Sequence, residues 1–316
     1  MTDQKKLPTR NGYGDALMEL GQSNSSVVVL TADLAESLRV QTFQEKYPDR
    51  FFDVGVAEQN MMGIAAGLAL TGKIPFVSSY AVFSPGRSWD QFRVSVCYSQ
   101  ANVKVAGGHT GLSVGPDGAT HQALEDLAIT RCLPNLTILV PVDAEEARKA
   151  TLAAASHQGP VYIRLSREPT DVLTTSATYF EIGKAYVMRP GKDMTFIVCG
   201  TLMQEALRAA DQLATQGISA EVINNHTLKP LDEKTLLSSL RKTGAAVTIE
   251  EHQLMGGMGS AVAEMCAQNL PIPLEMIGMH DHFGESGTPT ELLEKYGMTS
   301  TAIVSAALRV LSRKIG

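Results

Sequence analysis

The sequence predicts an α/β protein built from two doubly wound domains with mostly parallel sheets. Short apolar runs of strand length alternate with longer amphipathic segments along the 316 residues, which is the pattern of a parallel sheet covered by helices. Glycine is frequent, with 27 residues, whereas aromatic residues make up only 6%, and this composition favours close packing of helices on sheets. The length fits about two domains, which we expect at residues 1–180 and 190–316.

The first half of the chain contains six apolar runs that we expect to form strands, at residues 26–30, 52–55, 73–80, 103–107, 136–140 and 161–165. Helices are expected between them, at residues 13–20, 39–47, 58–70, 83–92, 121–128 and 144–155. Gly21 is expected to close the first helix. Asp143 and Glu146 have the spacing of a capping box at the start of the last one.

The second half repeats the alternation after an interruption. Residues 168–190 break the pattern and are expected to form a linker. A smaller domain of about four strands should follow, at residues 194–199, 220–224, 245–250 and 274–278. Its helices are expected at residues 204–216, 232–241, 260–269, 288–296 and 300–313. Asp232 is placed to cap the second of these helices.

Composition excludes several classes of function. The formal net charge is −6 and no basic block occurs, so a nucleic-acid-binding surface is not expected. The amino-terminal residues lack an apolar signal region, and no run of about 18 apolar residues is present. We therefore expect a soluble, cytoplasmic protein that does not contact a membrane. The cysteines lie in separate apolar segments, as Cys97, Cys132, Cys199 and Cys266. We expect them to be reduced core residues, without disulfides and without a metal site.

The stretch from Phe52 to Met61 organises the rest of the chain, because it should join a buried strand to a helix that opens near Glu58. That helix is apolar and small-residue-rich nearly all round, so it should be deeply buried. Burial favours the neutral form of the Glu58 carboxyl group, whereas the helix amides favour its charged form. A carboxyl group held between these effects suits proton exchange with a ligand. The alternative is that Glu58 merely caps the helix.

Ligands of open parallel sheets bind beyond the carboxyl ends of the strands. In the first half, those ends gather polar and aromatic residues, namely Asp33, Ser37, Glu58, Tyr80, Phe83, His109, Asp117, His121 and Arg167. The glycine-rich stretch 108–122 allows the backbone to approach a ligand closely, and a histidine there could bind a phosphate or transfer a proton. Each residue also has a purely structural explanation. The histidines would then be a solvated loop residue and a helix-start residue, and the two aromatic residues a core pair.

Other polar groups are weaker signals. Arg10, Arg87 and Arg167 suit bidentate binding of an anion, although isolated surface arginines are common. The glycine-rich turn 256–260 at a helix start could cradle an anion, but tight packing explains it better. Residues 280–282 (His-Asp-His) are interpreted as loop polarity and not as metal ligands.

Three stretches together resemble transketolases. They are residues 53–60 (Asp-Val-Gly-Val-Ala-Glu-Gln-Asn), 115–122 (Gly-Pro-Asp-Gly-Ala-Thr-His-Gln) and 165–167 (Leu-Ser-Arg), in the order and spacing of the transketolase pyrimidine-binding domain. Residues 250–252 (Glu-Glu-His) and 283–287 (Phe-Gly-Glu-Ser-Gly) resemble its C-terminal domain. The Gly-Asp-Gly motif of the amino-terminal transketolase domain, which holds metal and pyrophosphate, does not occur in this sequence. The chain therefore resembles the C-terminal subunit of a split, two-chain transketolase.

The resemblance implies roles in an enzyme that uses thiamine diphosphate. Glu58 would be catalytic, bonding the aminopyrimidine ring and so promoting deprotonation of the thiazolium carbon. Tyr80 would stack on the pyrimidine, and Phe83 would line the same pocket. His121 would be the second catalytic residue, bonding substrate hydroxyl groups and moving protons. The implied substrate contacts are Arg10, Ser37 and Arg167 for a phosphate, His109 beside them, and Asp117 for a sugar hydroxyl group.

Two residues fit the resemblance less closely. Arg87 lies where the match is loose and is expected to add an anion contact if it has a role in the site. Asp33 matches an acidic residue near the subunit contact.

The implied activity is transfer of a two-carbon ketol unit from a ketose phosphate to an aldose or aldose phosphate. The implied partner is an N-terminal subunit that carries Gly-Asp-Gly and binds Mg²⁺ or Ca²⁺, in a heterotetramer of two copies of each chain. Two alternatives share the fold, the beta subunit of a 2-oxo-acid dehydrogenase and 1-deoxyxylulose-5-phosphate synthase. The sugar-reading residues 117–122 disfavour the first, and His109, where the second family usually has Arg, disfavours the second. A noncatalytic scaffold is a further alternative, disfavoured by the retained polar residues.

Overall fold

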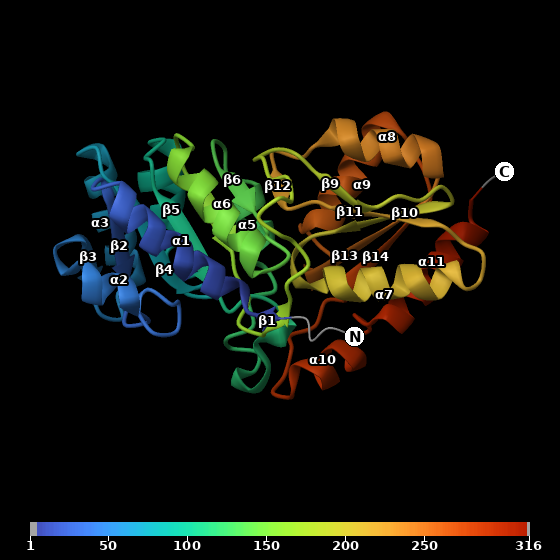
Figure 1. The fold of residues 1–316 in the computed structure, drawn as a ribbon, viewed down its shortest axis with the longest axis horizontal. Helices are drawn as coiled ribbons and strands as arrows, with labels where there is room; N and C mark the ends of the chain where they lie inside the picture. Colours follow the sequence, from blue (N-terminus) through green and yellow to red (C-terminus); the bar gives the residue numbers. More distant parts are fainter. Residues whose placement is uncertain (1–4, 315–316) are drawn as a thin grey trace.

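The computed structural model describes residues 5–314 and contains two large sheets that lie side by side, each with helices on both faces (Figure 1). The larger sheet has seven strands in the order β12-β6-β7-β5-β4-β2-β3. Their bounds are Val27–Thr31 (β2), Phe51–Asp53 (β3), Ile74–Tyr80 (β4), Lys104–Gly108 (β5), Thr137–Leu139 (β6), Val161–Arg164 (β7) and Thr227–Lys229 (β12). All pairs are parallel except β12 with β6. The strand β12 comes from the second half of the chain, so the two halves share this sheet.

Helices cover the larger sheet on both faces. They are α1 (Thr9–Ser23), α2 (Gln41–Lys46), α3 (Glu58–Leu70), α4 (Trp89–Gln91), α5 (Asp126–Arg131) and α6 (Ala144–Ser156), with short turns η1 (Pro48–Arg50) and η3 (Leu112–Asp117) and the π-helix η2 (Phe92–Tyr98). One core lies between the sheet and α1, α2 and α6, where Tyr13, Phe43 and Ala150 are buried. The core on the opposite face includes Met61, Phe92 and Leu127 from α3, η2 and α5. This is the doubly wound arrangement that the sequence predicts.

The second sheet has five strands in the order β14-β13-β10-β11-β9. They are β9 (Tyr186–Arg189), β10 (Met194–Val198), β11 (Ala220–Asn224), β13 (Ala246–Gln253) and β14 (Leu274–Met279). The covering helices are α7 (Met203–Ala214), α8 (Glu233–Thr243), α9 (Met258–Asn269), α10 (Pro289–Lys295) and α11 (Ser300–Ser312), and the short turn η4 (Gly200–Leu202) precedes α7. Asp232 caps α8 by accepting a hydrogen bond from the backbone N–H of Thr235, as expected. A small sheet pairs β1 (Lys6–Leu7) with β8 (Thr170–Asp171).

Several expectations about the elements are wrong. The expected linker 168–190 contains β8 and β9, and β9 adds an antiparallel fifth strand to a domain expected to have about four. The helix expected from residue 83 begins at Trp89. The helix expected from His121 begins at Asp126, because the preceding residues turn back on Gly118, whose carbonyl oxygen accepts from the N–H groups of both His121 and Gln122. Of the cysteines expected in the core, Cys132 is exposed at the C-cap of α5.

Helix α3 is buried on one face only, so the expectation of deep burial all round is wrong. Met61, Met62 and Ala65 pack into the core, whereas Gly63 and Gly67 are exposed. Leu70 at its end is 76% exposed. A helix that presents apolar and small residues to solvent has a surface suited to contact with another chain.

A buried ion pair joins the two halves at the carboxyl end of β7. Arg164 donates two hydrogen bonds to Asp126, from Nε to Oδ2 at 2.8 Å and from Nη2 to Oδ1 at 3.0 Å. Tyr162 donates to the same carboxylate at 2.7 Å, and Arg164 Nη2 donates to the carbonyl oxygen of Glu251 in β13 at 3.0 Å. Although burial opposes ionisation of Asp126, Arg164 lowers the pKa of this carboxyl group. The charged pair therefore fixes β7, α5 and β13 relative to one another.

A second buried acid, Glu146, connects α6 to β11. Its Oε2 accepts from the N–H of Val142 at 2.8 Å, and its Oε1 accepts from Nδ2 of Asn224 at 2.7 Å. Asp143 caps α6 as the sequence predicts, by accepting from the N–H of Glu146. The side chain of Glu146 bonds Val142 and so does not complete the expected capping box. Burial raises the pKa of Glu146 to about 8.

This pKa predicts a specific pH dependence of stability. The folded chain keeps a proton on Glu146 that the unfolded chain loses near its ordinary pKa of 4.5, so stability decreases as pH rises from that value towards about 8. Glu146→Gln keeps the shape of the side chain and cannot ionise. We expect its free energy of unfolding to increase relative to that of the wild type, which means greater relative stability, from about pH 5 to about pH 8. Urea unfolding across this range tests the prediction, and parallel pH profiles for the two proteins would contradict it.

Candidate active site

Glu58 lies at the start of α3 and is paired with a cation. Its side chain is 2% exposed, and Nη1 of Arg87 donates to its Oε2 at 2.8 Å. The turn that leads into the helix is fixed by Asp53, whose Oδ1 accepts from the N–H of Gly55 at 3.0 Å. Gly55 has φ +69°, a conformation that favours glycine. Arg87, which is expected to add an anion contact, pairs here with the protein's own carboxylate, and its contact with a bound anion stays a prediction. Within residues 5–314, the Glu58 carboxylate makes no capping hydrogen bond to α3; it is buried and paired with the half-exposed Arg87.

Arg87 also lies on an aromatic wall. Its guanidinium carbon lies 4.6 Å from the centroid of the Phe83 ring, and the Phe83 ring is stacked with that of Tyr80, with centroids 5.8 Å apart. Both aromatic side chains are partly exposed, and Tyr80 also packs against the core beneath α1. The space between Phe83 and Glu58 thus accommodates a planar, cationic group of nitrogen donors.

The two histidines complete a cluster of four rings. His109 stacks on Tyr80, with centroids 3.7 Å apart. His121 meets Tyr80 and Phe83 edge-on, with centroids 6.0 and 5.5 Å away. Nδ1 of His121 lies 2.9 Å from Oγ1 of Thr120, which leaves Nε2 for another partner. The tertiary structure therefore brings together residues that are more than 40 positions apart in the sequence.

His109 is held in its neutral form. It is 2% exposed, and burial, together with the nearby Arg10 and Arg167, lowers its pKa to about 3. Its Nε2 lies 3.4 Å from Nη1 of Arg10, and its buried Nδ1 has no hydrogen-bond partner among residues 5–314. A neutral imidazole whose Nε2 accepts from an arginine carries its proton on Nδ1. His109 can therefore donate one hydrogen bond, but it cannot add positive charge to an anion site.

Arginines gather next to this ring cluster. Arg10 Nη1 donates to the carbonyl oxygen of Ser37 at 2.8 Å, and the Tyr80 hydroxyl donates to Oγ of Ser37 at 3.2 Å. Burial and the proximity of Arg39 and Arg167 lower the pKa of Arg10. Its Nε is buried without a partner in the described part of the chain. Converging guanidinium groups with an unused donor are the features of a site for an oxyanion. The sequence interpretation missed Arg39, because nothing local distinguishes it from other arginines.

Arg167 and Asp117 face each other at the far side of the site. Nη1 of Arg167 lies 3.2 Å from Oδ1 of Asp117 and donates to the carbonyl oxygen of Val114 at 2.9 Å. Asp33, by contrast, is exposed and shows no side-chain contact with the ring cluster among the described residues; its N–H donates to Asp53. The structure thus groups every residue predicted for cofactor and substrate, while Asp33 lies outside the group.

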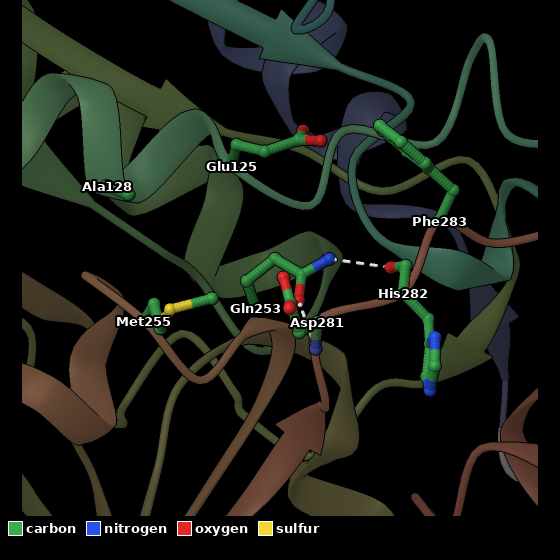
Figure 2. Close-up of a pocket in the computed structure, with 7 residues that line it drawn as sticks. All are labelled: Glu125, Ala128, Gln253, Met255, Asp281, His282 and Phe283. Carbon is green, nitrogen blue, oxygen red and sulfur yellow. Dashed lines mark hydrogen bonds between the residues drawn. The ribbon is translucent and has the colours of Figure 1, made fainter.

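The remaining polar motifs of the sequence have structural partners. The glycine-rich turn 256–260 does hold an anion, the carboxylate of Glu250, which accepts from the N–H groups of Met258 and Gly259, both at 2.7 Å. In the segment 280–282, the N–H of Asp281 donates to Gln253, which in turn donates to the carbonyl oxygen of His282 (Figure 2). Within residues 5–314, no group of three His, Cys, Asp or Glu side chains could hold a metal ion.

A pocket of about 310 Å³ lies beside that segment and is separate from the ring cluster. Figure 2 shows the seven residues that line it: Glu125, Ala128, Gln253, Met255, Asp281, His282 and Phe283. None of them is a predicted site residue. Phe283 is 77% exposed.

Comparisons with known proteins agree with this architecture. Residues 5–171 match the family model of the transketolase pyrimidine-binding domain, and residues 183–303 match that of the transketolase C-terminal domain. The 6-deoxy-6-sulfo-D-fructose transketolase subunit SqwH of Clostridium sp. (strain MSTE9) is 45% identical over 305 residues, covering 96% of this chain and 95% of that protein. A putative transketolase C-terminal section of Methanocaldococcus jannaschii is 42% identical over 308 residues, covering 96% of both chains.

A solved structure extends the likeness to the fold. The structure of a split gene transketolase, described as an inactive beta4 tetramer, has a TM-score of 0.92 and 47% sequence identity. The match covers 98% of this chain and all of that one. No helix among residues 5–314 has the length and apolar character needed to cross a membrane.

The ion pair of Glu58 predicts the effect of removing its cation. Arg87→Met would leave a buried carboxylate without a counter-charge, so we expect the free energy of unfolding at neutral pH to fall by about 1–3 kcal/mol. Glu58→Gln in the same chain should recover most of this loss, because the uncompensated charge is then absent. Urea unfolding measures all three proteins. Arg93→Met is the matched control, since Arg93 is exposed and lies next to this region in η2. Equal stability of the Arg87 and Arg93 variants would rule the prediction out.

The environment of His109 predicts that its ring does not titrate at physiological pH. Imidazole ¹⁵N resonances of His109, assigned with the His109→Asn variant, should stay at their neutral positions from about pH 8 to about pH 5. The unfolded chain gains a proton near pH 6.5 that the folded ring accepts only near pH 3. Stability should therefore be lost as pH falls below about 6.5, and less so in His109→Asn. Titration of the folded ring near neutrality would contradict this assignment.

Proposed function

The chain belongs to the transketolase family, and we propose that it is the C-terminal subunit of a two-chain transketolase that uses thiamine diphosphate. The proposed reaction is transfer of a two-carbon ketol unit from a ketose with a terminal anionic group to an aldose acceptor. The observation that carries this proposal is the buried carboxylate of Glu58 facing an aromatic wall across a space that holds a planar, cationic nitrogen group. These features are the ones an aminopyrimidine ring requires.

The residues present fit the pyrimidine half of the cofactor. Arg87 serves as an internal stand-in: its flat guanidinium group stacks over Phe83 and donates to Glu58, as an aminopyrimidine would. Binding of the ring would require Arg87 to give up its bond to Glu58. Tyr80 and Phe83 would then hold the ring, and Glu58 would bind a proton at the ring nitrogen. When bound, thiamine diphosphate supplies the carbanion and the electron sink for cleavage of the carbon–carbon bond.

The neighbouring side chains fit a sugar with a charged end. His109 offers a neutral donor at Nδ1, and His121 offers Nε2 for a substrate hydroxyl group. Arg10, Ser37 and Arg167 would bind the terminal anion, with Asp117 directed to a hydroxyl group of the sugar. Tetrahedral oxyanions such as phosphate and sulfonate present similar oxygen atoms to guanidinium groups. Because the similar subunit SqwH is named for a sulfofructose, we propose both a phosphate and a sulfonate as candidate terminal groups.

A partner chain is part of the proposal. The Gly-Asp-Gly motif is absent from the sequence, so an N-terminal subunit would supply the site for pyrophosphate and Mg²⁺ or Ca²⁺. Exposed apolar residues on and beside α3 and the neighbouring η2 suit such an assembly: Val56 in the turn before α3 is 70% exposed, Leu70 at the end of α3 76% and Tyr98 at the end of η2 82%. We propose a heterotetramer with two copies of each chain. The similar solved structure is a beta4 tetramer described as inactive, in keeping with a need for the second chain.

A pull-down of the tagged chain from its own cells, followed by mass spectrometry, identifies the partner. We expect a chain with Gly-Asp-Gly, and we expect the mixture with thiamine diphosphate and Mg²⁺ to transfer ketol groups from a ketose 6-phosphate or a 6-sulfo ketose. The separate chain should be inactive. Recovery of a lipoyl-bearing acyltransferase core would replace this proposal with a 2-oxo-acid dehydrogenase subunit.

The role of Glu58 is tested in the assembled enzyme. Glu58→Gln should lower kcat by about 10²–10⁴-fold, because proton transfer through the ring nitrogen is impaired. Glu233→Gln, at an exposed position in the first turn of α8, is the matched control and should retain wild-type kcat. Steady-state kinetics with the ketose donor provides the measurement. A Glu58→Gln enzyme with wild-type kcat would exclude this role.

A further inference from the structure

We propose that Glu251, in the second sheet, is a positioning residue that holds the substrate-side loop 111–122 in its binding-competent conformation. The inference rests on the proposed function, because it concerns the loop that carries Asp117 and His121. It assigns to the C-terminal half of the chain a part in the active site, although no residue of that half lies in the ring cluster.

Glu251 reaches Ser113, near the start of the loop. The side chain is 4% exposed, and its Oε1 accepts a short hydrogen bond from the N–H of Ser113. Its Oε2 accepts from Oγ of Ser113 at 3.1 Å and from Oγ1 of Thr201 at 3.4 Å. A buried carboxylate that binds both the backbone and the side chain of one residue fixes that residue more firmly than a neutral bond would.

The loop is shaped to receive this carboxylate. Gly111 has φ +83°, and a Cβ atom there would lie 2.5 Å from Cδ of Glu251. A side chain at residue 111 would therefore displace the carboxylate, in addition to being strained at this φ. The amino end of the loop is held within the first half of the chain, because the N–H of Gly111 donates to Ala123 at 2.8 Å. Glu251 then holds the next part of the loop, at Ser113.

Other residues of the second half also contact loop 111–122. The backbone carbonyl oxygen of Glu285 accepts from Nε2 of Gln122 at 2.9 Å. A Cβ atom on Gly118 would lie 2.6 Å from Oγ of Ser286, and one on Gly115 would lie 3.2 Å from Cδ of Pro289. In Figure 1, α10 lies below the junction of the two halves, on the side of this loop. The C-terminal half thus covers the outer side of the loop, opposite the ring cluster.

The consequence for the substrate site follows from the residues after Ser113. Val114 is the next residue, and its carbonyl oxygen accepts from Arg167 at 2.9 Å. Asp117 pairs with the same guanidinium group at 3.2 Å. A pocket of about 210 Å³ lined by Ser113, Glu251 and Thr201 borders the loop on this side, so a released loop would have room to shift. Glu251 therefore sets the position of Arg167 and Asp117 without touching substrate.

The neighbouring residue Glu250 provides a matched control. It is equally buried, at 1% exposed, and lies on the opposite face of β13, where its carboxylate binds the first N–H groups of α9. Removal of either carboxylate takes one buried acid out of the same strand. Of the two, only Glu251 contacts the loop. A difference between the two variants therefore measures the loss of the bonds from Glu251 to Ser113, which we call the anchor, and not damage to β13.

Hydrogen exchange of the isolated chain tests the anchor without any need for activity. In Glu251→Ala, exchange of the amides at residues 112–118 should become at least about tenfold faster, because a buried charge-assisted bond is lost. In Glu250→Ala, these amides should exchange as in the wild type, whereas those at the start of α9 should exchange faster. Glu251→Gln keeps an acceptor for the N–H of Ser113 and should restore most of the protection. If Glu251→Ala does not fold, Ser113→Ala, which loses only the Oγ bond, should show a smaller increase in the same amides.

Kinetics of the assembled enzyme provides the second measurement. Glu251→Ala should raise the KM for the ketose donor about tenfold and leave the KM for thiamine diphosphate unchanged, and Glu251→Gln should restore the donor KM. Unchanged exchange at residues 112–118, the same exchange pattern in both alanine variants, or equal increases in the two KM values would overturn the inference. An assembly without ketol transfer, combined with the expected exchange pattern, would refute the proposed function and leave the anchor in place.

Discussion

The arrangement of the site depends on the buried ion pair between Arg164 and Asp126. Arg164 ends a central strand of the first sheet, and its guanidinium group binds Asp126 of α5 and the backbone of Glu251 in β13 at the same time. A bidentate pair of this kind has little freedom of orientation, and breaking a buried pair costs several kcal/mol because a charge is left without a partner. Because Arg164 fixes α5 and β13 relative to β7, the loop between β5 and α5 lies among elements whose positions are fixed. With its surroundings fixed in this way, loop 111–122 keeps a defined position although it is rich in glycine.

Four of the five glutamates that are buried among residues 5–314 show how the environment of a carboxyl group sets what it can do. The carboxylate of Glu250 accepts hydrogen bonds from the first N–H groups of α9, so its role is structural. Glu146 contacts only neutral donors, and its pKa rises to about 8. Glu251 binds a loop, and burial raises its pKa although Ser113 and Arg164 oppose the rise. Glu58 differs from all three, because its partner is a partly exposed arginine, which a ligand can replace. The fifth, Glu221, also pairs with a half-exposed cation, Lys242. What distinguishes Glu58 is that its cation lies over the Phe83 ring, which suits this carboxylate to proton exchange with a bound ring.

The two halves of the chain contribute differently to the proposed site. The first half supplies the rings, the arginines and the carboxylate that the proposed reaction uses. The second half contributes a strand to the first sheet and buries the outer side of loop 111–122 through Glu251, Glu285 and Pro289. The apolar face of α3 lies exposed on the first half, so the assembly proposed above and the support of the loop would use different surfaces. The proposed partner would then leave the contacts that hold loop 111–122 in place.

The sequence by itself determined the α/β class, most strands and the start of α3 at Glu58, because these features follow from local patterns of apolar runs, glycines and helix caps. The candidate site residues came from the resemblance to transketolases and stay predictions. It also determined the family, through short motifs whose order is kept. It failed at residues 121–128, where a glycine turn delays the helix, and at β9, an edge strand in a segment that lacks the apolar alternation. Only the tertiary structure decided which groups meet. Arg87 pairs with a carboxylate 29 residues away, and Glu251 with a serine 138 residues away. The first pairing depends on how the segments that follow β3 and β4 meet at one edge of the first sheet, and the second on how the two sheets pack. Residue spacing along the chain carries no signal for either.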